Sequence, residues 1–346
     1  MNIFYYDNEK NVYYSKLEAI SAAKKGKFVN FYFYDKEFTQ VDWKTEPPES
    51  LSELYKQRAQ KIRDEYEYVI VCYSGGVDST NILESFYYNN IHIDEIVMVG
   101  AFSQDSYAGS DENHNGDVFH NAKPTLNHLH LPNTKISTFD YTDWFRDTNN
   151  FTLIKTYGDE WTKYIGAWQS VHHLWWYDFK KFVGRNNNKK TCWIMGSEKP
   201  QFSSKYPAST SFVDLGCNDY GGKYIDENFT RVNFYNDIDP TAVKVMLKQN
   251  HLLKKFTQER KKYGENAVFD LKGEQLIAKV IYDLKNPILF HSKKSISHSI
   301  SSRDMFMLNK TDSDMYKMFL LGLNTIKKYK NVNEKNSFMS RPYYLE

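Results

Sequence analysis

The sequence predicts an α/β protein in which helices cover both faces of a parallel sheet. The first sign is the short apolar run at residues 69–72, which is rich in β-branched side chains and precedes a glycine pair. A run without polar alternation is typical of a parallel strand buried on both faces. Further strands are predicted at 94–102, 136–141 and 191–196. A right-handed crossover through the helix that follows the glycine pair would place the first two strands side by side.

The chain divides into three parts on this interpretation. Residues 1–48 form a small N-terminal β-α-β element, and the polar, proline-bearing segment 45–50 is its boundary. Residues 49–225 hold the parallel sheet, and residues 226–346 form a mainly helical C-terminal region packed on it. The strands of the N-terminal element are expected at 2–6 and 28–34.

Composition places few limits on function. The chain has 346 residues with 45 basic and 43 acidic side chains, so its overall charge gives no argument for nucleic acid, although a local basic patch is not excluded. Three scattered cysteines favour a reducing compartment over a disulfide framework. No apolar run is long enough to cross a bilayer, and the N-terminus lacks the order of a signal peptide. We therefore expect a cytoplasmic protein without a membrane partner.

The stretch from 68 to 90 predicts a phosphate site, because it reads as buried strand, tight glycine turn and helix. Gly75 and Gly76 can adopt unusual φ and let backbone N–H groups approach a ligand closely. The helix begins at about Asp78, and the free N–H groups of a helix N-terminus bind anions. The hydroxyls there can add donors, namely those of Ser74, Ser79 and Thr80. A carboxylate at Asp78 suggests a magnesium ion that bridges it to phosphate oxygens.

The hexapeptide from Ser74 to Ser79, SGGVDS, resembles the pyrophosphate loop of the N-type ATP pyrophosphatases, or PP-loop superfamily. This group holds asparagine synthetase, GMP synthetase, NAD synthetase and tRNA-thiolating enzymes. The resemblance covers about residues 65–200 and is closest to the synthetase domain of asparagine synthetase. It implies an adenine nucleotide alpha hydrolase-like fold, ATP and Mg²⁺ as cofactors, and cleavage of ATP between its α- and β-phosphates to adenylate an acceptor oxygen.

The resemblance also implies site residues beyond the loop. Catalysis is assigned to Asp78 and Lys199, and magnesium to Asp78 and Glu198. Lys199 departs from the acidic, glycine-rich second motif of the family, and either neutralises phosphate charge or is a surface lysine. The expected nucleotide-binding residues are Ser74, Gly75, Gly76, Val77, Asp78, Ser79, Thr80, Ala101, Phe102, Ser103 and Gly196.

Asparagine synthetases carry an N-terminal glutaminase domain whose nucleophile is the cysteine after the initiator methionine. Asn2 stands at that position here, and about fifty residues are too few for such a domain. We therefore expect a separate ammonia or amine donor.

Several segments have alternative interpretations. Residues 104–121 favour a substrate loop, and the Lys and Arg side chains of the helix at 51–66 favour a solvated face. His128 and His130 could present two imidazoles to zinc, but solvent-facing histidines are favoured because a third ligand is missing. The apolar stripe of the helical region 159–185 would suit either a core or a subunit contact, so a homo-oligomer is conceivable.

Three functions remain. The first is an AMP-forming ligase of the asparagine synthetase type, and the second is a sulfurtransferase or nucleobase-modifying enzyme in which a cysteine carries sulfur. The second is disfavoured because Cys72 and Cys192 lie in predicted buried strands and only Cys217 lies in a loop. The third is a non-catalytic nucleotide-binding protein. The acceptor could be a small molecule such as an amino acid, a nucleotide or a modified base, and nucleic acid is not excluded.

Overall fold

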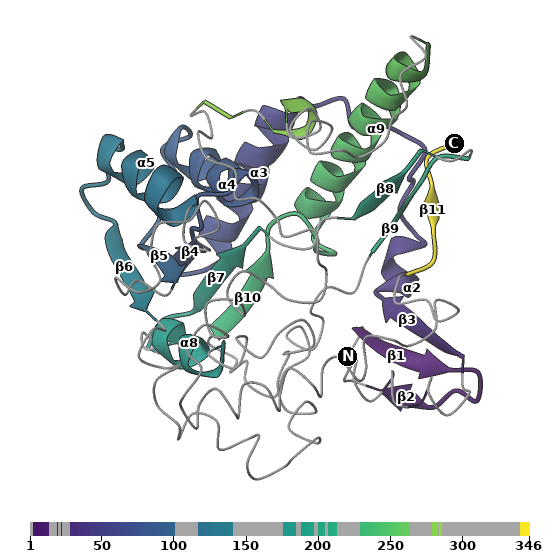
Figure 1. Ribbon diagram of the computed structural model, residues 1–346, viewed down its shortest axis with the longest axis horizontal. Coiled ribbons are helices and arrows are strands. Elements are labelled where there is room, and N and C mark those ends of the chain that lie inside the picture. The colour runs from purple at the N-terminus through teal and green to yellow at the C-terminus, as the bar shows by residue number, and fades with distance from the viewer. Residues whose placement is uncertain are drawn as a thin grey trace, which may run out of the picture.

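The structure is a computed structural model, which describes residues 3–13, 19, 22, 28–100, 117–140, 176–184, 188–196, 200–204, 207–212, 229–262, 279–282, 284–285 and 340–346. A five-stranded parallel sheet in the order β10-β7-β4-β5-β6 forms its centre (Figure 1). The strands are β4 (Tyr68–Cys72), β5 (Glu95–Gly100), β6 (Lys135–Asp140), β7 (Thr191–Met195) and β10 (Phe229–Asn233). The predicted α/β fold with a parallel sheet is confirmed. The fifth strand, β10, was not predicted.

The strand order reverses beside β4. From β4 the chain adds β5 and then β6 on one side, and it later adds β7 and then β10 on the other. Val71 pairs with Ile96 of β5 on one side and with Ile194 of β7 on the other. Open α/β sheets bind ligands at such a switch point, beyond the carboxyl ends of the strands.

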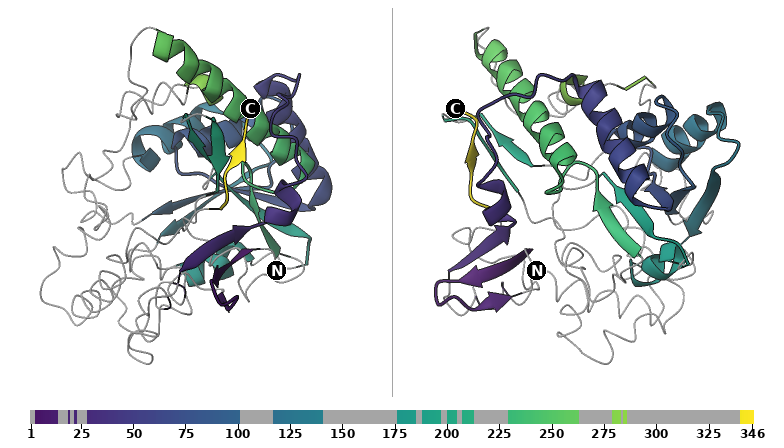
Figure 2. Two further views of the ribbon diagram at one scale, coloured as in Figure 1. Left: turned by 90° about the vertical axis from the view of Figure 1, so that its right-hand side faces the viewer. Right: turned by 180° about the vertical axis from the view of Figure 1, so that it is seen from behind.

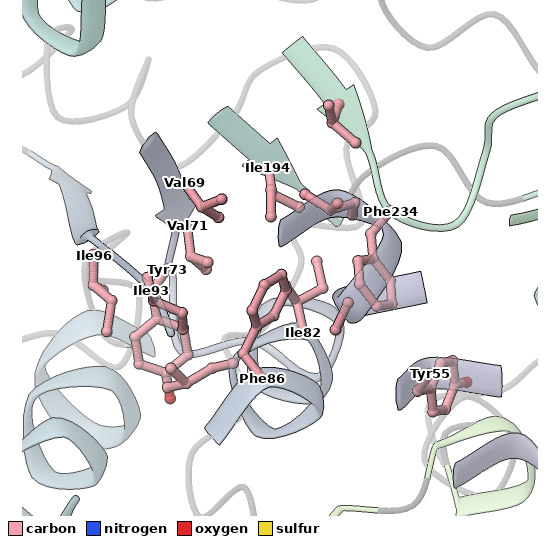
Figure 3. Close-up of a cluster of buried hydrophobic side chains, with 14 of the residues drawn as sticks. Tyr55, Val69, Val71, Tyr73, Ile82, Phe86, Ile93, Ile96, Ile194 and Phe234 are labelled. Carbon is pink, nitrogen blue, oxygen red and sulfur yellow. The ribbon is translucent and has the colours of Figure 1, made fainter. Parts of the chain in front are cut away.

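One face of the sheet is covered by α3 (Leu51–Glu65) and α4 (Val77–Tyr87). Ile82 and Phe86 of α4 are fully buried in one cluster with Val71 and Ile194 (Figure 3). Each such side chain contributes about 1.5 to 3 kcal/mol by leaving water. Packing on both β4 and β7 therefore fixes α4 above the switch point.

The opposite face is covered by α8 (Trp176–Val183). Phe179 is fully buried, and its ring centroid lies 5.4 Å from Trp193 of β7 and 5.3 Å from Phe139 of β6. Because side chains pack on both faces of the sheet, its central strands β4 and β7 show no polar alternation.

The predicted boundary at 45–50 is tied to the long helix α9 (Pro240–Lys262). Lys248 forms an ion pair with Glu46 at 2.9 Å, and Lys244 forms one with Glu49 at 2.5 Å. Because α9 continues to Lys262, the polar connector predicted at 259–265 is wrong for its first four residues.

A second core lies beside the parallel sheet, and four distant parts of the chain build it, including Met246 and Leu247 of α9. Its largest rings include Phe33, Phe38, Phe212 and Tyr343. The antiparallel sheet β2-β1-β3 lies on the same side of the molecule as β11, away from β6 (Figure 2). The elements around this core are β1 (Ile3–Asp7), β2 (Val12–Tyr13), β3 (Val29–Phe33), α2 (Asp35–Phe38), β8 (Gln201–Ser203), β9 (Ser209–Ser211) and β11 (Tyr343–Tyr344).

Two helical segments follow β5 in the described chain, η2 (Val118–Ala122) and α5 (Lys123–His128). The loop predicted at 104–121 is therefore wrong for residues 117–121, and its earlier part lies outside the described residues. None of the helices in the described part of the chain combines the length and apolar character of a membrane span.

Candidate functional site

The turn between β4 and α4 requires a glycine at position 75. Gly75 has a φ of 82°, in the left-handed region that side chains with a Cβ rarely adopt. A Cβ there would also lie 2.7 Å from the backbone nitrogen of Ala122 and closer still to the carbonyl oxygen of Asp117. The turn is thus pressed against η2, and both conformation and space exclude a larger residue.

Hydrogen bonds between the two serines hold the turn in shape. The hydroxyl oxygens of Ser74 and Ser79 lie 3.1 Å apart, and the N–H of Gly76 donates to Ser74 Oγ at 3.3 Å. Ser79 donates in turn to the Gly76 carbonyl at 3.1 Å. Gly76 is the N-cap of α4 and provides no side-chain cap. The first-turn N–H groups and the positive end of the helix dipole are therefore presented to an anion.

Asp78, in the first turn of α4, is held by two tyrosines from elsewhere in the chain, one at its carboxylate and one at its main-chain carbonyl. The Tyr282 hydroxyl donates to Asp78 Oδ1. The Tyr235 hydroxyl donates to the main-chain carbonyl of Asp78 at 2.8 Å and accepts from the Asn81 amide at 2.9 Å. Burial raises the pKa of Tyr282 and of Tyr235 well above the usual value of 10, so both phenols stay protonated and donate.

Gly196, which follows β7, lies against the same turn of α4. A Cβ at Gly196 would come within 3.0 Å of Asp78 Cβ and 3.1 Å of Ile82 Cδ1. The structure therefore brings together the predicted residues at 74–79 and Gly196. Tyr235 adds a contact from the end of β10, so the carboxyl ends of three neighbouring strands meet at one helix N-terminus.

Not every predicted site residue joins this group. Thr80 is fully buried, and its hydroxyl lies 3.4 Å from that of Tyr73 on the core side of the helix. Its role as a phosphate donor stays a prediction. Five other predicted residues lie outside the described part of the chain, namely Ala101, Phe102, Ser103, Glu198 and Lys199.

The residues present are compatible with magnesium held jointly with a phosphate ligand. Within the described ranges, no three His, Cys, Asp or Glu side chains form a metal-binding group. Magnesium, however, is commonly bound by one or two carboxylates together with substrate phosphates and water. Asp78 supplies a carboxylate in the first turn of α4, beside the uncapped helix N-terminus, so the donor set fits. His128 and His130 are exposed, as expected of solvent-facing histidines, although His128 ends α5 instead of lying in an extended segment.

The two described cysteines are poor nucleophiles. Burial raises the pKa of Cys72, the last residue of β4, to about 12. The thiol of Cys192 is fully buried in β7, and its pKa is also raised by burial. Both thiols are therefore protonated at neutral pH, whereas sulfur chemistry needs a thiolate. Cys217 lies outside the described residues.

Sequence reasoning missed Arg58, which contradicts the solvated face predicted for the helix at 51–66. Arg58 is only 2% exposed and donates to the carbonyls of Asn233 and Phe234 at 3.1 and 3.2 Å. It also forms ion pairs with Asp237 and Asp239 at 3.1 and 3.2 Å. Arg58 stands four residues after buried Leu54 and four before buried Ile62. This spacing places all three on one face of the helix, and it was the available signal that Arg58 is buried.

Tyr235 and Tyr282 were also missed. Tyr235 follows β10, and the run FTRVNFY at 229–235 carries the β-branched and aromatic side chains of a strand. Nothing in the sequence around Tyr282 points to Asp78. The two residues are 204 positions apart, and only the folded chain places them together.

The fold and the turn define a doubly wound α/β protein with a helix N-terminus that lacks a side-chain cap at its switch point. No family model and no curated protein match the chain. The solved structures include an NH3-dependent NAD synthetase from Campylobacter jejuni subsp. jejuni NCTC 11168, in complex with a nitrate ion. That chain is 12% identical, with a TM-score of 0.32, and the match covers 83% of this chain and 99% of the other. So loose a likeness carries no argument about function.

Proposed function

We propose that the protein is an ATP-dependent enzyme that releases AMP and pyrophosphate and joins a nitrogen nucleophile to an adenylated acceptor. One observation carries the proposal. The SGGVDS turn, with its required Gly75, leads into a helix N-terminus without a side-chain cap at the switch point of the sheet. A helix end that presents N–H groups beside a carboxylate favours a polyphosphate bound together with a divalent cation.

Each residue of the site has a role in this proposal. The backbone of Gly75 and Gly76 and the hydroxyl of Ser74 bind the phosphates that leave as pyrophosphate. Magnesium, when bound, neutralises charge that develops on the leaving group. Asp78 holds that ion, and the Tyr282 hydroxyl bond to Asp78 Oδ1 keeps the carboxylate in one orientation.

The remaining roles are extensions of the same proposal. Ala101, Phe102 and Ser103 would contact adenine, Glu198 would share the magnesium ion, and Lys199 would neutralise phosphate charge. Ammonia or an amine would arrive from a separate donor, as in an asparagine synthetase-like reaction. A sulfurtransferase is less well supported, because the pKa of both described cysteines is raised by burial.

The test is product analysis with ATP, magnesium and a panel of amino acids, nucleotides and modified nucleosides. AMP and pyrophosphate in equal amounts are expected, and Asp78→Asn should abolish their formation. Asp64→Asn is the matched control, because Asp64 is an exposed carboxylate on α3. ADP as the product would overturn the proposal.

A second experiment separates the ligase from the sulfurtransferase. The triple variant Cys72→Ala, Cys192→Ala, Cys217→Ser should keep its turnover. Loss of turnover in the folded variant, traced to Cys217→Ser alone, would favour sulfur transfer. ATP binding without turnover of any acceptor would favour the non-catalytic alternative.

A further inference from the structure

The antiparallel sheet formed by β1, β2 and β3 has aromatic side chains on both of its faces. Tyr5, Phe31 and Phe33 point inward and are at most 2% exposed. Phe4 and Tyr6 alternate with Tyr5 along β1 and therefore lie on the outer face, where they are half-buried. The outer face of such a sheet is usually polar, so rings gathered there indicate a binding surface.

The outer rings are held in a fixed arrangement. Phe4 and Tyr32 are directly opposite each other across β1 and β3, and their rings stack with centroids 4.5 Å apart and planes 7° apart. Tyr6 meets Phe4 edge-on at 6.3 Å. The Tyr32 hydroxyl accepts a hydrogen bond from the backbone N–H of Lys36 at 3.1 Å, which ties the ring to α2. A rigid aromatic platform loses little conformational entropy when a ligand stacks on it.

Positive charge surrounds these rings. They line an open cavity of about 540 Å³ together with the exposed side chains of Lys10, Lys36 and Arg341. Asp35 lines the same cavity, but its carboxylate already accepts a hydrogen bond from the Tyr343 hydroxyl at 3.0 Å. Three cations beside one carboxylate that is already hydrogen-bonded favour an anionic ligand. The aromatic rings favour a ligand that also carries flat rings.

We propose that this cavity, called the aromatic groove below, binds single-stranded nucleic acid. Unpaired bases would stack on Phe4, Tyr6 and Tyr32, because proteins commonly bind single strands by stacking bases on sheet aromatics. The cationic rim, formed by Lys10, Lys36 and Arg341, would contact the phosphates. A duplex keeps its bases inside and offers no flat ring to the groove. The groove lies on the face of this sheet that points away from the second core, and it shares no residue with the turn at 74–79, so this inference does not depend on the proposed function.

The first experiment measures fluorescence anisotropy with a labelled single-stranded RNA of about 12 nucleotides. The full-length protein should bind the single strand more tightly than a duplex of the same length. Phe4→Leu and Tyr32→Leu should each weaken binding at least about fivefold, because stacked bases contribute substantially to affinity. Tyr88→Leu is the control, because it removes an aromatic ring that is 46% exposed at the end of α4. Thermal unfolding checks that each variant is folded.

The second experiment changes cations of the rim instead of aromatic rings. It therefore tests the proposal even if a ring variant does not fold. Lys36→Ala and Arg341→Ala change exposed side chains and should each lower the slope of log affinity against log salt by about 0.7. Lys56→Ala, an exposed cation on α3, should leave the slope unchanged. Wild-type affinity in both the ring and the rim variants would overturn the proposal. Equal binding of the duplex, or displacement by uridine monophosphate as effective as by the oligonucleotide, would overturn it too.

Discussion

Tyr282 donates a hydrogen bond to the carboxylate of Asp78, in the first turn of the helix that follows the glycine turn. Neighbouring contacts attach the same part of the chain to both α3 and α4. The Tyr55 hydroxyl donates to the carbonyl of Ile281, and the N–H of Lys285 donates to Glu84 at 2.7 Å. The candidate site thus includes a side chain from a part of the sequence that no motif marks.

Replacing Tyr282 by Phe should weaken binding of ATP with magnesium by about tenfold or more. A hydrogen bond to a charged group is worth about 1.5 to 3 kcal/mol, and its loss lets the Asp78 carboxylate rotate. Isothermal titration calorimetry measures the effect. Tyr343→Phe is the matched control, because it removes a hydroxyl that donates to Asp35 in the second core. Equal affinity of wild type and Tyr282→Phe would refute the role of Tyr282.

Gly75→Ala should destabilise the fold by about 2 kcal/mol or more, since the left-handed backbone and the close contact with η2 both oppose a Cβ. Gly76→Ala is the matched comparison, because the nearest atom to its Cβ would be Ser74 Oγ at 3.5 Å. It should cost about 1 kcal/mol or less, as an N-cap change does. Urea unfolding of both variants checks the difference. Equal stability of the two would contradict the geometry of the turn.

Arg58→Met should lower the free energy of unfolding by about 3 to 5 kcal/mol. The substitution leaves the carboxylates of Asp237 and Asp239 without their partner and the carbonyls at the end of β10 without a donor. Thermal and urea unfolding measure the loss, and Lys56→Met on the exposed side of α3 is the control. A loss below about 1 kcal/mol would place Arg58 among weak surface interactions.

His251 should make the fold sensitive to mild acid. Burial lowers the pKa of His251 below its usual 6.5, and its Nε2 lies 3.1 Å from the Trp43 carbonyl oxygen. As pH falls from about 7 to about 5, the unfolded chain takes up this proton before the folded one does, so stability present above the unfolded pKa is lost. His251→Gln should reduce this decline in urea unfolding. His130→Gln, which changes an exposed histidine, should leave it unchanged.

The sequence predicted the features that short segments determine. The apolar run before Gly75, the glycine pair and the helix after it are local signals, and the strand, turn and helix are confirmed. The segment at 191–196 is confirmed in the same way as β7, with Gly196 against Asp78.

Features that depend on distant contacts were missed, because their local signals were weak or absent. β10 contains Thr230 and Arg231 between its apolar residues, so it lacks the continuous apolar run of β4. The charge of Arg58 favoured solvent, but partners about 175 residues away make its burial favourable. Tyr282 is likewise defined by its contact with Asp78 and not by its own neighbours in the sequence.

The second core affects the order in which the protein can be made. Phe38 in α2 packs against Tyr343, and Tyr343 bonds to Asp35, which lies 308 positions earlier. Contacts at such separation require the intervening chain to be ordered before they form, which slows folding. On the ribosome, the rings of Phe33 and Phe38 must wait for Phe212, and Phe38 waits also for Tyr343, the last of these to emerge. During synthesis they are exposed hydrophobic surface, and holding chaperones would bind them at that stage.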